Sequence, residues 1–179
     1  AARRWKATGS IRTRRGNPRC DQNRRHDGVR IAENQIMPAV ASLLETALYT
    51  SDVERSASFY RKLFGFPEIL SDGARLIVLA LPGNSVLLLF RKGASTEPMS
   101  FPGGMIPPHD GEGTTHLAFN AGPGGLAAWD AALAAEKIEI ESRVHWPRGG
   151  ISIYFRDPDG HLLEIVEGNI WGLETGGDT

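Results

Sequence analysis

The order of predicted secondary-structure elements occurs twice in this chain of 179 residues: strand, helix, then three strands. In each copy a strand-like run precedes a helical pattern, and three short apolar runs follow, separated by turn signals. The first copy covers about residues 42–91 and the second about 114–170, with residues 92–113 between them. The copies share little sequence, so the repeat lies in the order of elements. We therefore expect an α+β fold of two βαβββ repeats, whose curved sheets enclose a cavity.

The helices and turns carry most of this prediction. In SDVERSASFYRKLFGF, Ser51 or Asp52 can cap a helix and Gly65 ends it. The second helix is the Ala-rich run Leu126–Glu136, entered through GPGG. Residues 92–113 are rich in Gly and Pro, which indicates a long loop of the kind that is usually functional or mobile. The predicted strands are Ser42–Thr50, Pro67–Leu70, Arg75–Leu81, Ser85–Phe90, Thr114–Asn120, Glu139–Val144, Ile151–Phe155 and Leu162–Glu167.

Charge divides the chain into a basic head and an acidic body. Residues 1–36 hold ten Lys or Arg against three acidic residues, and residues 37–179 hold ten against 18. The head has no periodic apolar face, which is typical of an unstructured segment. A nucleic-acid arm and a transit peptide fit its composition, whereas a secretory signal does not. We interpret it as a disordered leader or an added extension, with the natural domain starting at Met37, and we expect no nucleic-acid partner.

Other whole-chain features narrow the class of protein. No apolar run approaches the roughly 20 residues of a membrane-spanning helix, so no membrane partner is expected. The single cysteine, Cys20, excludes an intrachain disulfide and a Cys-based zinc site. The cysteine count is compatible with a reducing cytoplasm, and we expect a cytoplasmic protein.

Three polar residues occupy strand positions where apolar residues are expected: Glu45, His116 and Glu164. Singly, a carboxylate there is usually on the solvent face, and a histidine is usually a satisfied core residue. Together they follow the internal repeat, because Glu45 and His116 lie in the first strands of the two copies and Glu164 lies in the last strand of the second. This pattern predicts a site for one divalent metal ion with open positions for water and substrate. Two carboxylates and one imidazole suit Fe, Mn, Ni, Co or Zn.

The motifs SDVERSASFYRKLFGF, GTTHLAFN and FRDPDGHLLEIVE resemble those of the vicinal-oxygen-chelate superfamily. This superfamily includes glyoxalase I, extradiol dioxygenases, fosfomycin-resistance transferases and bleomycin-binding proteins, and the resemblance covers about residues 42–170. It implies that His116 and Glu164 are metal ligands. Glu45 falls where most members have His or Gln, and Leu88 falls near the fourth ligand position of glyoxalase I.

Further residues are candidates for the site. Alternation along ISIYF places Ser152 and Tyr154 on one face of a strand, and the resemblance to the fosfomycin branch implies that they contact substrate; the outer sheet face is the alternative. His109, in the long loop, is either an acid–base group or a solvated residue. Trp146 and Arg148 either bind an anion or ring or only form a turn. Our predicted catalytic residues are His109 and Tyr154, with Ser152, Trp146 and Arg148 binding substrate.

Three functions fit these features. The leading hypothesis is a metal-dependent enzyme that chelates a small oxygenated substrate, nearest to a three-ligand extradiol dioxygenase. The alternatives are a glyoxalase-like isomerase or lyase and a metal-free drug-binding protein of the bleomycin-resistance type. The resemblance also implies a homodimer with shared sites, in which Glu45 comes from one subunit and His116 with Glu164 from the other.

Overall fold

The computed structural model describes residues 38–172, so the prediction for the basic head lies outside the described residues. The chain separates into the units 1–39 and 40–179, and the fold below is that of the second unit. No helix in the described part of the chain is long and apolar enough to cross a membrane.

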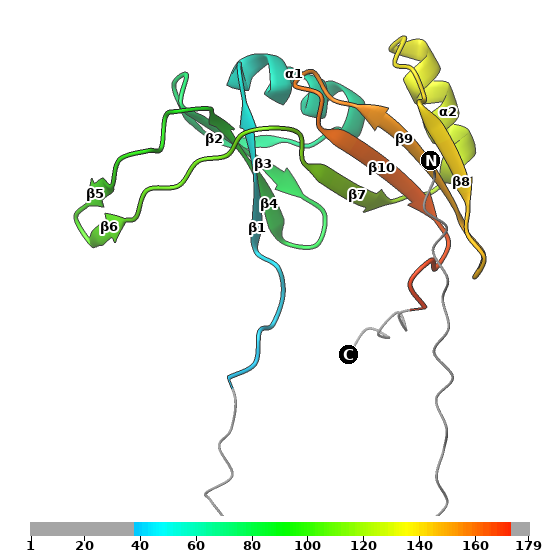
Figure 1. The fold of residues 1–179 in the computed structure, drawn as a ribbon, viewed down its shortest axis with the longest axis horizontal. Coiled ribbons are helices and arrows are strands. Elements are labelled where there is room, and N and C mark those ends of the chain that lie inside the picture. The colour runs from blue at the N-terminus through cyan, green and yellow to red at the C-terminus, as the bar shows by residue number, and fades with distance from the viewer. Residues whose placement is uncertain (1–37, 173–179) are drawn as a thin grey trace, which may run out of the picture. The chain divides into compact units, whose positions relative to one another are not determined.

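Each half of the chain forms one four-stranded sheet and one helix, which confirms the predicted fold class (Figure 1). The first sheet has the strand order β1-β4-β3-β2 and the second β7-β10-β9-β8. In both sheets the edge pair, β1 with β4 or β7 with β10, is parallel and the other pairs are antiparallel. The elements of the first half are β1 (Glu45–Thr50), α1 (Val53–Phe64), β2 (Glu68–Asp72), β3 (Leu76–Leu81) and β4 (Ser85–Arg91). Those of the second half are β7 (His116–Asn120), α2 (Gly125–Ala135), β8 (Ser142–His145), β9 (Ile151–Arg156) and β10 (Leu162–Glu167).

The two helices begin in different ways. The Asp52 carboxylate caps α1 by accepting hydrogen bonds from the amides of Glu54 and Arg55, both at 3.1 Å. Helix α2 follows Gly124, which has no side chain to cap it, and the carboxylate of Glu167 from β10 accepts the amide of Leu126 at 2.7 Å instead. Both helices lie on the same side of the sheets (Figure 1).

Strand alternation divides the residues of each sheet between a core face and an opposite face. In β1, Leu48 and Thr50 are buried toward the core, whereas Glu45 and Tyr49 belong to the other face. The core faces of both sheets and the two helices contribute to one hydrophobic cluster. Its fully buried members include Leu48, Leu87, Leu89, Leu133, Ile153, Phe155, Leu163 and Ile165.

A turn between β9 and β10 of the second half contacts the first half. Asp159, between β9 and β10, accepts the amide and hydroxyl of Ser51 at 2.7 and 2.6 Å and the hydroxyl of Ser56 at 2.9 Å. Nearby, the hydroxyl of Tyr60 on α1 donates to Asp157 at 2.9 Å. His161 accepts the Thr115 amide at Nδ1, so its Nε2–H donates to the Tyr49 carbonyl, which makes it a structural bridge.

The segment of residues 92–113 differs from the loop that its composition indicates. It contains a short hairpin of β5 (Met99–Phe101) and β6 (Gly104–Ile106), which are antiparallel. Gly104 has a φ of 150°, which only glycine adopts readily, and this residue opens the return strand. Because Pro and Gly residues surround these two short strands, the sequence shows no strand-like alternation there.

Candidate metal centre

His116, Tyr154 and Glu164 lie together on the face of the second sheet that points away from the core. Glu164 is directly opposite Tyr154 in the antiparallel pair β9–β10, and Leu162 is opposite His116 in the parallel pair β7–β10. Residues two apart in a strand share a face, so the register brings these three side chains to one place. The rings of His116 and Tyr154 are stacked with their centroids 6.3 Å apart.

The carboxylate of Glu164 is 5% exposed and has a partner at each oxygen. The Tyr154 hydroxyl donates to Oε1 at 2.8 Å, and Oε2 lies 3.1 Å from Nε2 of His116. Burial, and then the hydrogen bond and negative charge of Glu164, raise the pKa of Tyr154 to about 12. Tyr154 therefore stays protonated near neutral pH, and its hydroxyl is a permanent hydrogen-bond donor to the carboxylate.

His116 faces this carboxylate through Nε2. Its Nδ1 lies 3.1 Å from the carbonyl oxygen of Leu162, which only accepts hydrogen bonds, so Nδ1 carries the proton of a neutral ring. Nε2 and the Glu164 oxygen then face each other as two acceptors at 3.1 Å, a contact that is favourable only with a proton or a cation between them. Two ligands each about 2.1 Å from one cation and at right angles would be about 3.0 Å apart. The pair therefore fits as two ligands of a divalent metal ion. The other ring nitrogen, Nδ1, is hydrogen-bonded to a backbone carbonyl, which is common in metal-binding histidines.

Glu45 does not reach this pair within the chain. Its side chain is exposed and makes no hydrogen bond or ion pair within residues 38–172. No group of three or more His, Cys, Asp or Glu residues in the described part of the chain is arranged to hold a metal ion. One chain therefore brings together His116 and Glu164 of the three predicted ligands, and Glu45 stays a prediction.

Two of the predicted substrate residues extend the face around Glu164. The Trp146 indole donates to the hydroxyl of fully buried Ser152 at 2.7 Å, and Ser152 lies two residues before Tyr154 in β9. Arg148 is turned elsewhere, with its guanidinium 3.4 Å from the carbonyl of Trp171.

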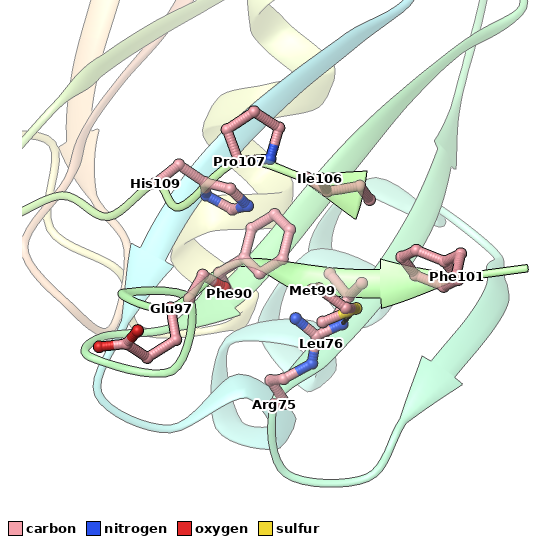
Figure 2. Close-up of a pocket in the computed structure, with 10 residues that line it drawn as sticks. Arg75, Leu76, Phe90, Glu97, Met99, Phe101, Ile106, Pro107 and His109 are labelled. Carbon is pink, nitrogen blue, oxygen red and sulfur yellow. Dashed lines mark hydrogen bonds between the residues drawn. The ribbon is translucent and has the colours of Figure 1, made fainter. Parts of the chain in front are cut away.

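His109 lies against the first sheet. Its Nδ1 is 2.7 Å from the Tyr49 hydroxyl. Its ring makes a T-shaped contact with the Phe90 ring, with centroids 4.7 Å apart (Figure 2). Burial and the charge of Asp110 raise the pKa of Tyr49. No described contact joins His109 to Glu164. Sequence reasoning did not select Tyr49, although its place four residues after Glu45 in one strand puts both on the same face.

A sequence profile described as the glyoxalase/bleomycin resistance protein/dioxygenase superfamily matches residues 42–165. The chain belongs to this superfamily. This glyoxalase/dioxygenase superfamily member resembles a crystal structure of lactoylglutathione lyase from Agrobacterium tumefaciens, with 33% identity over 76% of this chain and 100% of that one and a TM-score of 0.67.

Two further structures share the fold of this superfamily member at lower identity. The fosfomycin resistance protein FosX from Mesorhizobium loti is 19% identical over 74% of this chain and 96% of that one, with a TM-score of 0.52. TioX from Micromonospora sp. ML1 is 21% identical over 70% of this chain and 98% of that one, with a TM-score of 0.55.

Proposed function

We propose that His116 and Glu164 hold one divalent cation, and that the chain is a metal-dependent enzyme acting on a small substrate with two neighbouring oxygens. The observation that carries this proposal is the 3.1 Å contact between Nε2 of His116 and the buried Glu164 carboxylate, with the other imidazole nitrogen used by a backbone carbonyl. When bound, the cation stabilises negative charge that develops on the two substrate oxygens.

The third ligand in this proposal is Glu45 of a second subunit in a homodimer. Support comes from its exposure, its lack of a partner within residues 38–172, and its place at the start of β1, equivalent to His116 at the start of β7. A site with two carboxylates and one imidazole suits Mn, Fe, Co, Ni or Zn. Membership of the superfamily supports a small-molecule partner.

A glyoxalase-type isomerase or lyase reaction agrees best with these groups. In that reaction a carboxylate, Glu164 or Glu45, takes a proton from the substrate carbon that carries the hydroxyl and returns it to the neighbouring carbonyl carbon. The hydroxyl proton moves to the former carbonyl oxygen, so the hydroxyl and carbonyl groups exchange places and no proton is gained or lost overall. Tyr154 remains a donor throughout, because its pKa is about 12, and it fixes the Glu164 carboxylate. Ser152 and Trp146 form the adjoining wall against which substrate is oriented. The name and 33% identity of the Agrobacterium relative also support this class of reaction.

The remaining predicted residues have conditional roles. His109 acts as an acid–base group only if the first sheet of a partner subunit faces Glu164, which the shared-site homodimer provides. Arg148 binds an anionic part of the substrate only if it leaves its contact with the Trp171 carbonyl.

Metal content and turnover test the proposal together. We expect purified chain to bind about one Ni(II) or Zn(II) per subunit and then to consume the hemithioacetal of methylglyoxal and glutathione. His116→Ala and Glu164→Ala should lose metal, whereas Arg143→Ala, a surface change in the second sheet, should keep it. A wild-type chain that binds no divalent metal at neutral pH contradicts the enzyme proposal and favours the metal-free binding protein.

Mixing two inactive variants tests the shared site. If Glu45 and Glu164 come from different subunits, Glu45→Ala and Glu164→Ala homodimers that exchange subunits will form mixed dimers with one intact site. Random exchange should restore about a quarter of the wild-type activity. Variants that exchange subunits and restore nothing contradict the assignment of Glu45 to a partner.

A ring-cleaving extradiol dioxygenase is the second candidate, because Leu88 takes the place in β4 that Glu164 has in β10. This equivalence limits the set to three ligands, as in that class. A dioxygenase of this kind, purified anaerobically with Fe(II), should take up oxygen when it is given a panel of catechols. Uptake with a catechol, together with no turnover of the hemithioacetal, would replace the isomerase proposal.

A further inference from the structure

Four polar side chains follow one another across the face of the second sheet that points away from the core. Ser152 and Tyr154 are two residues apart in β9, so their side chains share this face. Tyr154 is paired with Glu164 across β9 and β10. Trp146 directly follows β8, in the turn that leads back to β9. The order along this face is therefore an indole, two hydroxyls and the carboxylate of Glu164.

The turn that carries Trp146 is fixed by its backbone. The Trp146 amide donates to the Gly150 carbonyl at 3.1 Å, and the Gly149 amide donates to the Trp146 carbonyl at 3.0 Å. Gly150 has a φ of 94°, and a Cβ atom there would be 2.7 Å from the carbonyl oxygen of Glu167. Only glycine fits that position, and the close contact with the end of β10 holds the turn against the strand that carries Glu164.

The side chains at the two ends of this row make short contacts. Nε1 of Trp146 lies 2.7 Å from Oγ of Ser152, and the Tyr154 hydroxyl lies 2.8 Å from Oε1 of Glu164. Ser152 and Glu164 are both buried, and Trp146 and Tyr154 are partly buried. Hydrogen bonds between groups that are withdrawn from water are stronger than those at the surface.

The chemistry of the end groups determines the direction of every hydrogen bond in the row. An indole nitrogen only donates, so Ser152 accepts from Trp146 and keeps its own proton for another partner. An ionised carboxylate only accepts, so Tyr154 donates to Glu164 and its oxygen is free to accept. Burial and Glu164 raise the pKa of Tyr154, whereas a hydrogen bond from Ser152 acts to lower it, as a donor to the phenol oxygen does. All the protons therefore point toward Glu164.

We propose that Trp146 is a positioning residue for Glu164 and acts through the hydroxyls of Ser152 and Tyr154. Hydrogen bonds in series polarise one another, so the indole strengthens the donor that Tyr154 presents to Oε1. Oε2, which faces Nε2 of His116 at 3.1 Å, is then the oxygen left for a cation. This last consequence rests on the proposed metal site, whereas the row of hydrogen bonds exists without a metal ion.

Indole N–H signals in NMR spectra test the row in metal-free protein. The chain has four tryptophans, and Trp146→Phe assigns the signal of Trp146 in full-length ¹⁵N-labelled protein. We expect Tyr154→Phe and Glu164→Gln to shift this signal, although neither residue contacts the indole through a printed hydrogen bond of its own. Ser142→Ala is the matched control, because Ser142 is exposed and lies opposite Tyr154 on the same face but outside the row. A Trp146 signal that is identical in wild type, Tyr154→Phe and Glu164→Gln overturns the proposal.

A double-mutant cycle on Ni(II) affinity tests the effect on the proposed metal site. Trp146→Phe should weaken Ni(II) binding about two- to fourfold in wild type. It should have no effect in Tyr154→Phe, where the path to Glu164 is already broken. Ser152→Ala should behave in the same way and replaces Trp146→Phe if that variant does not fold, and Ser142→Ala should bind Ni(II) like wild type. An equal loss in both backgrounds would mean that Trp146 acts through packing alone and would overturn its positioning role.

The two experiments separate this proposal from the proposed function. Wild type that binds no Ni(II) contradicts the metal site, and the indole signals then decide by themselves whether Trp146 is coupled to Glu164. Normal Ni(II) binding together with an unmoved indole signal contradicts the coupling and leaves the metal site standing.

Discussion

The two sheets have the same strand order but carry different side chains at equivalent positions. The registers align His116, Glu164 and Tyr154 of the second sheet with Glu45, Leu88 and Val78 of the first. The second sheet thus presents an imidazole, a carboxylate and a phenol, whereas the first presents one carboxylate and two apolar residues. Repetition of the backbone plan therefore does not repeat the chemistry.

The carboxylates of the two sheets also differ in their surroundings. Glu164 is 5% exposed, accepts the Tyr154 hydroxyl and faces His116, so its position is fixed in the free chain. Glu45 is exposed at the start of β1 and has no partner within residues 38–172. In the proposed metal site, the second sheet provides a pair of side chains held in place by hydrogen bonds, and the first sheet provides one exposed carboxylate.

Removing ligands from each sheet should give the largest effect. We expect Glu164→Ala to weaken Ni(II) or Zn(II) binding more than about 100-fold, since even indirect partners of metal ligands contribute 10- to 100-fold. Glu45→Ala should weaken it about tenfold, and Leu88→Ala should leave it unchanged. Isothermal titration of the three variants measures the ranking. Equal losses of metal affinity in Glu45→Ala and Glu164→Ala would show that the two sheets contribute equally to metal binding. That result would contradict the proposed difference between the sheets.

The turns that join the last two strands of each sheet should differ next. Asp159 in the second half accepts three hydrogen bonds from the first half, and Asn84 in the first-half turn is exposed. Asp159→Ala should lower the free energy of unfolding by about 2 to 3 kcal/mol, because Ser51 and Ser56 lose their acceptor. Asn84→Gly, at a φ of 59°, should change it by less than about 0.5 kcal/mol. Urea unfolding of both variants provides the comparison, and similar values would remove the distinction between the turns.

The same carboxylate gives a pH dependence with a definite sign. Burial raises the pKa of Asp159, but hydrogen bonds from Ser51 and Ser56 and the contact with Arg55 outweigh it and lower the pKa to about 2. A depressed pKa in the folded state stabilises the protein above the unfolded value of 3.8, and this contribution of about 2 kcal/mol is lost as pH falls toward 2. Wild type should therefore lose more stability than Asp159→Ala between pH 5 and pH 2, as measured by thermal unfolding. Parallel curves for the two proteins would contradict the assigned pKa.

The fold was accessible from sequence because its signals are local. Asp52 and Gly65 mark the ends of α1, and apolar runs bounded by turns mark most strands. The candidate site was only partly accessible: His116 and Glu164 could be selected because each interrupts an apolar strand in the second repeat. Their pairing depends on the register of β7, β9 and β10, which is a property of the folded sheet. The β5–β6 hairpin was not predicted because it lies inside a Gly- and Pro-rich segment.

Tyr154 tests how much the surroundings of Glu164 matter beyond its identity. Val78 stands at the equivalent position of the first sheet and donates no hydrogen bond. Tyr154→Phe should weaken metal binding about tenfold while the fold is retained, because the carboxylate loses the donor at 2.8 Å. With a pKa of about 12, Tyr154 does not titrate below pH 10, so the pH profile of metal binding should keep its shape in this range. Unchanged affinity in Tyr154→Phe would mean that the ligands alone determine binding.

The helix starts should give the smallest difference between the halves. Asp52 caps α1 from its own N-cap position, whereas Glu167 reaches the first turn of α2 from β10. Asp52→Ala should cost about 1 kcal/mol of unfolding free energy, the usual value for a lost cap. Glu167→Gln keeps one acceptor oxygen and loses only the charge near the helix N-terminus, so about 0.5 kcal/mol is expected. Chemical denaturation measures both changes in unfolding free energy. Glu54→Gln is the control for loss of a charge in the first turn of a helix. A larger loss for Glu167→Gln than for Asp52→Ala would mean that α2 depends on its sheet more than α1 depends on its own cap. In that case one strand, β10, would stabilise the start of α2 through Glu167 and also carry Glu164 of the proposed metal site.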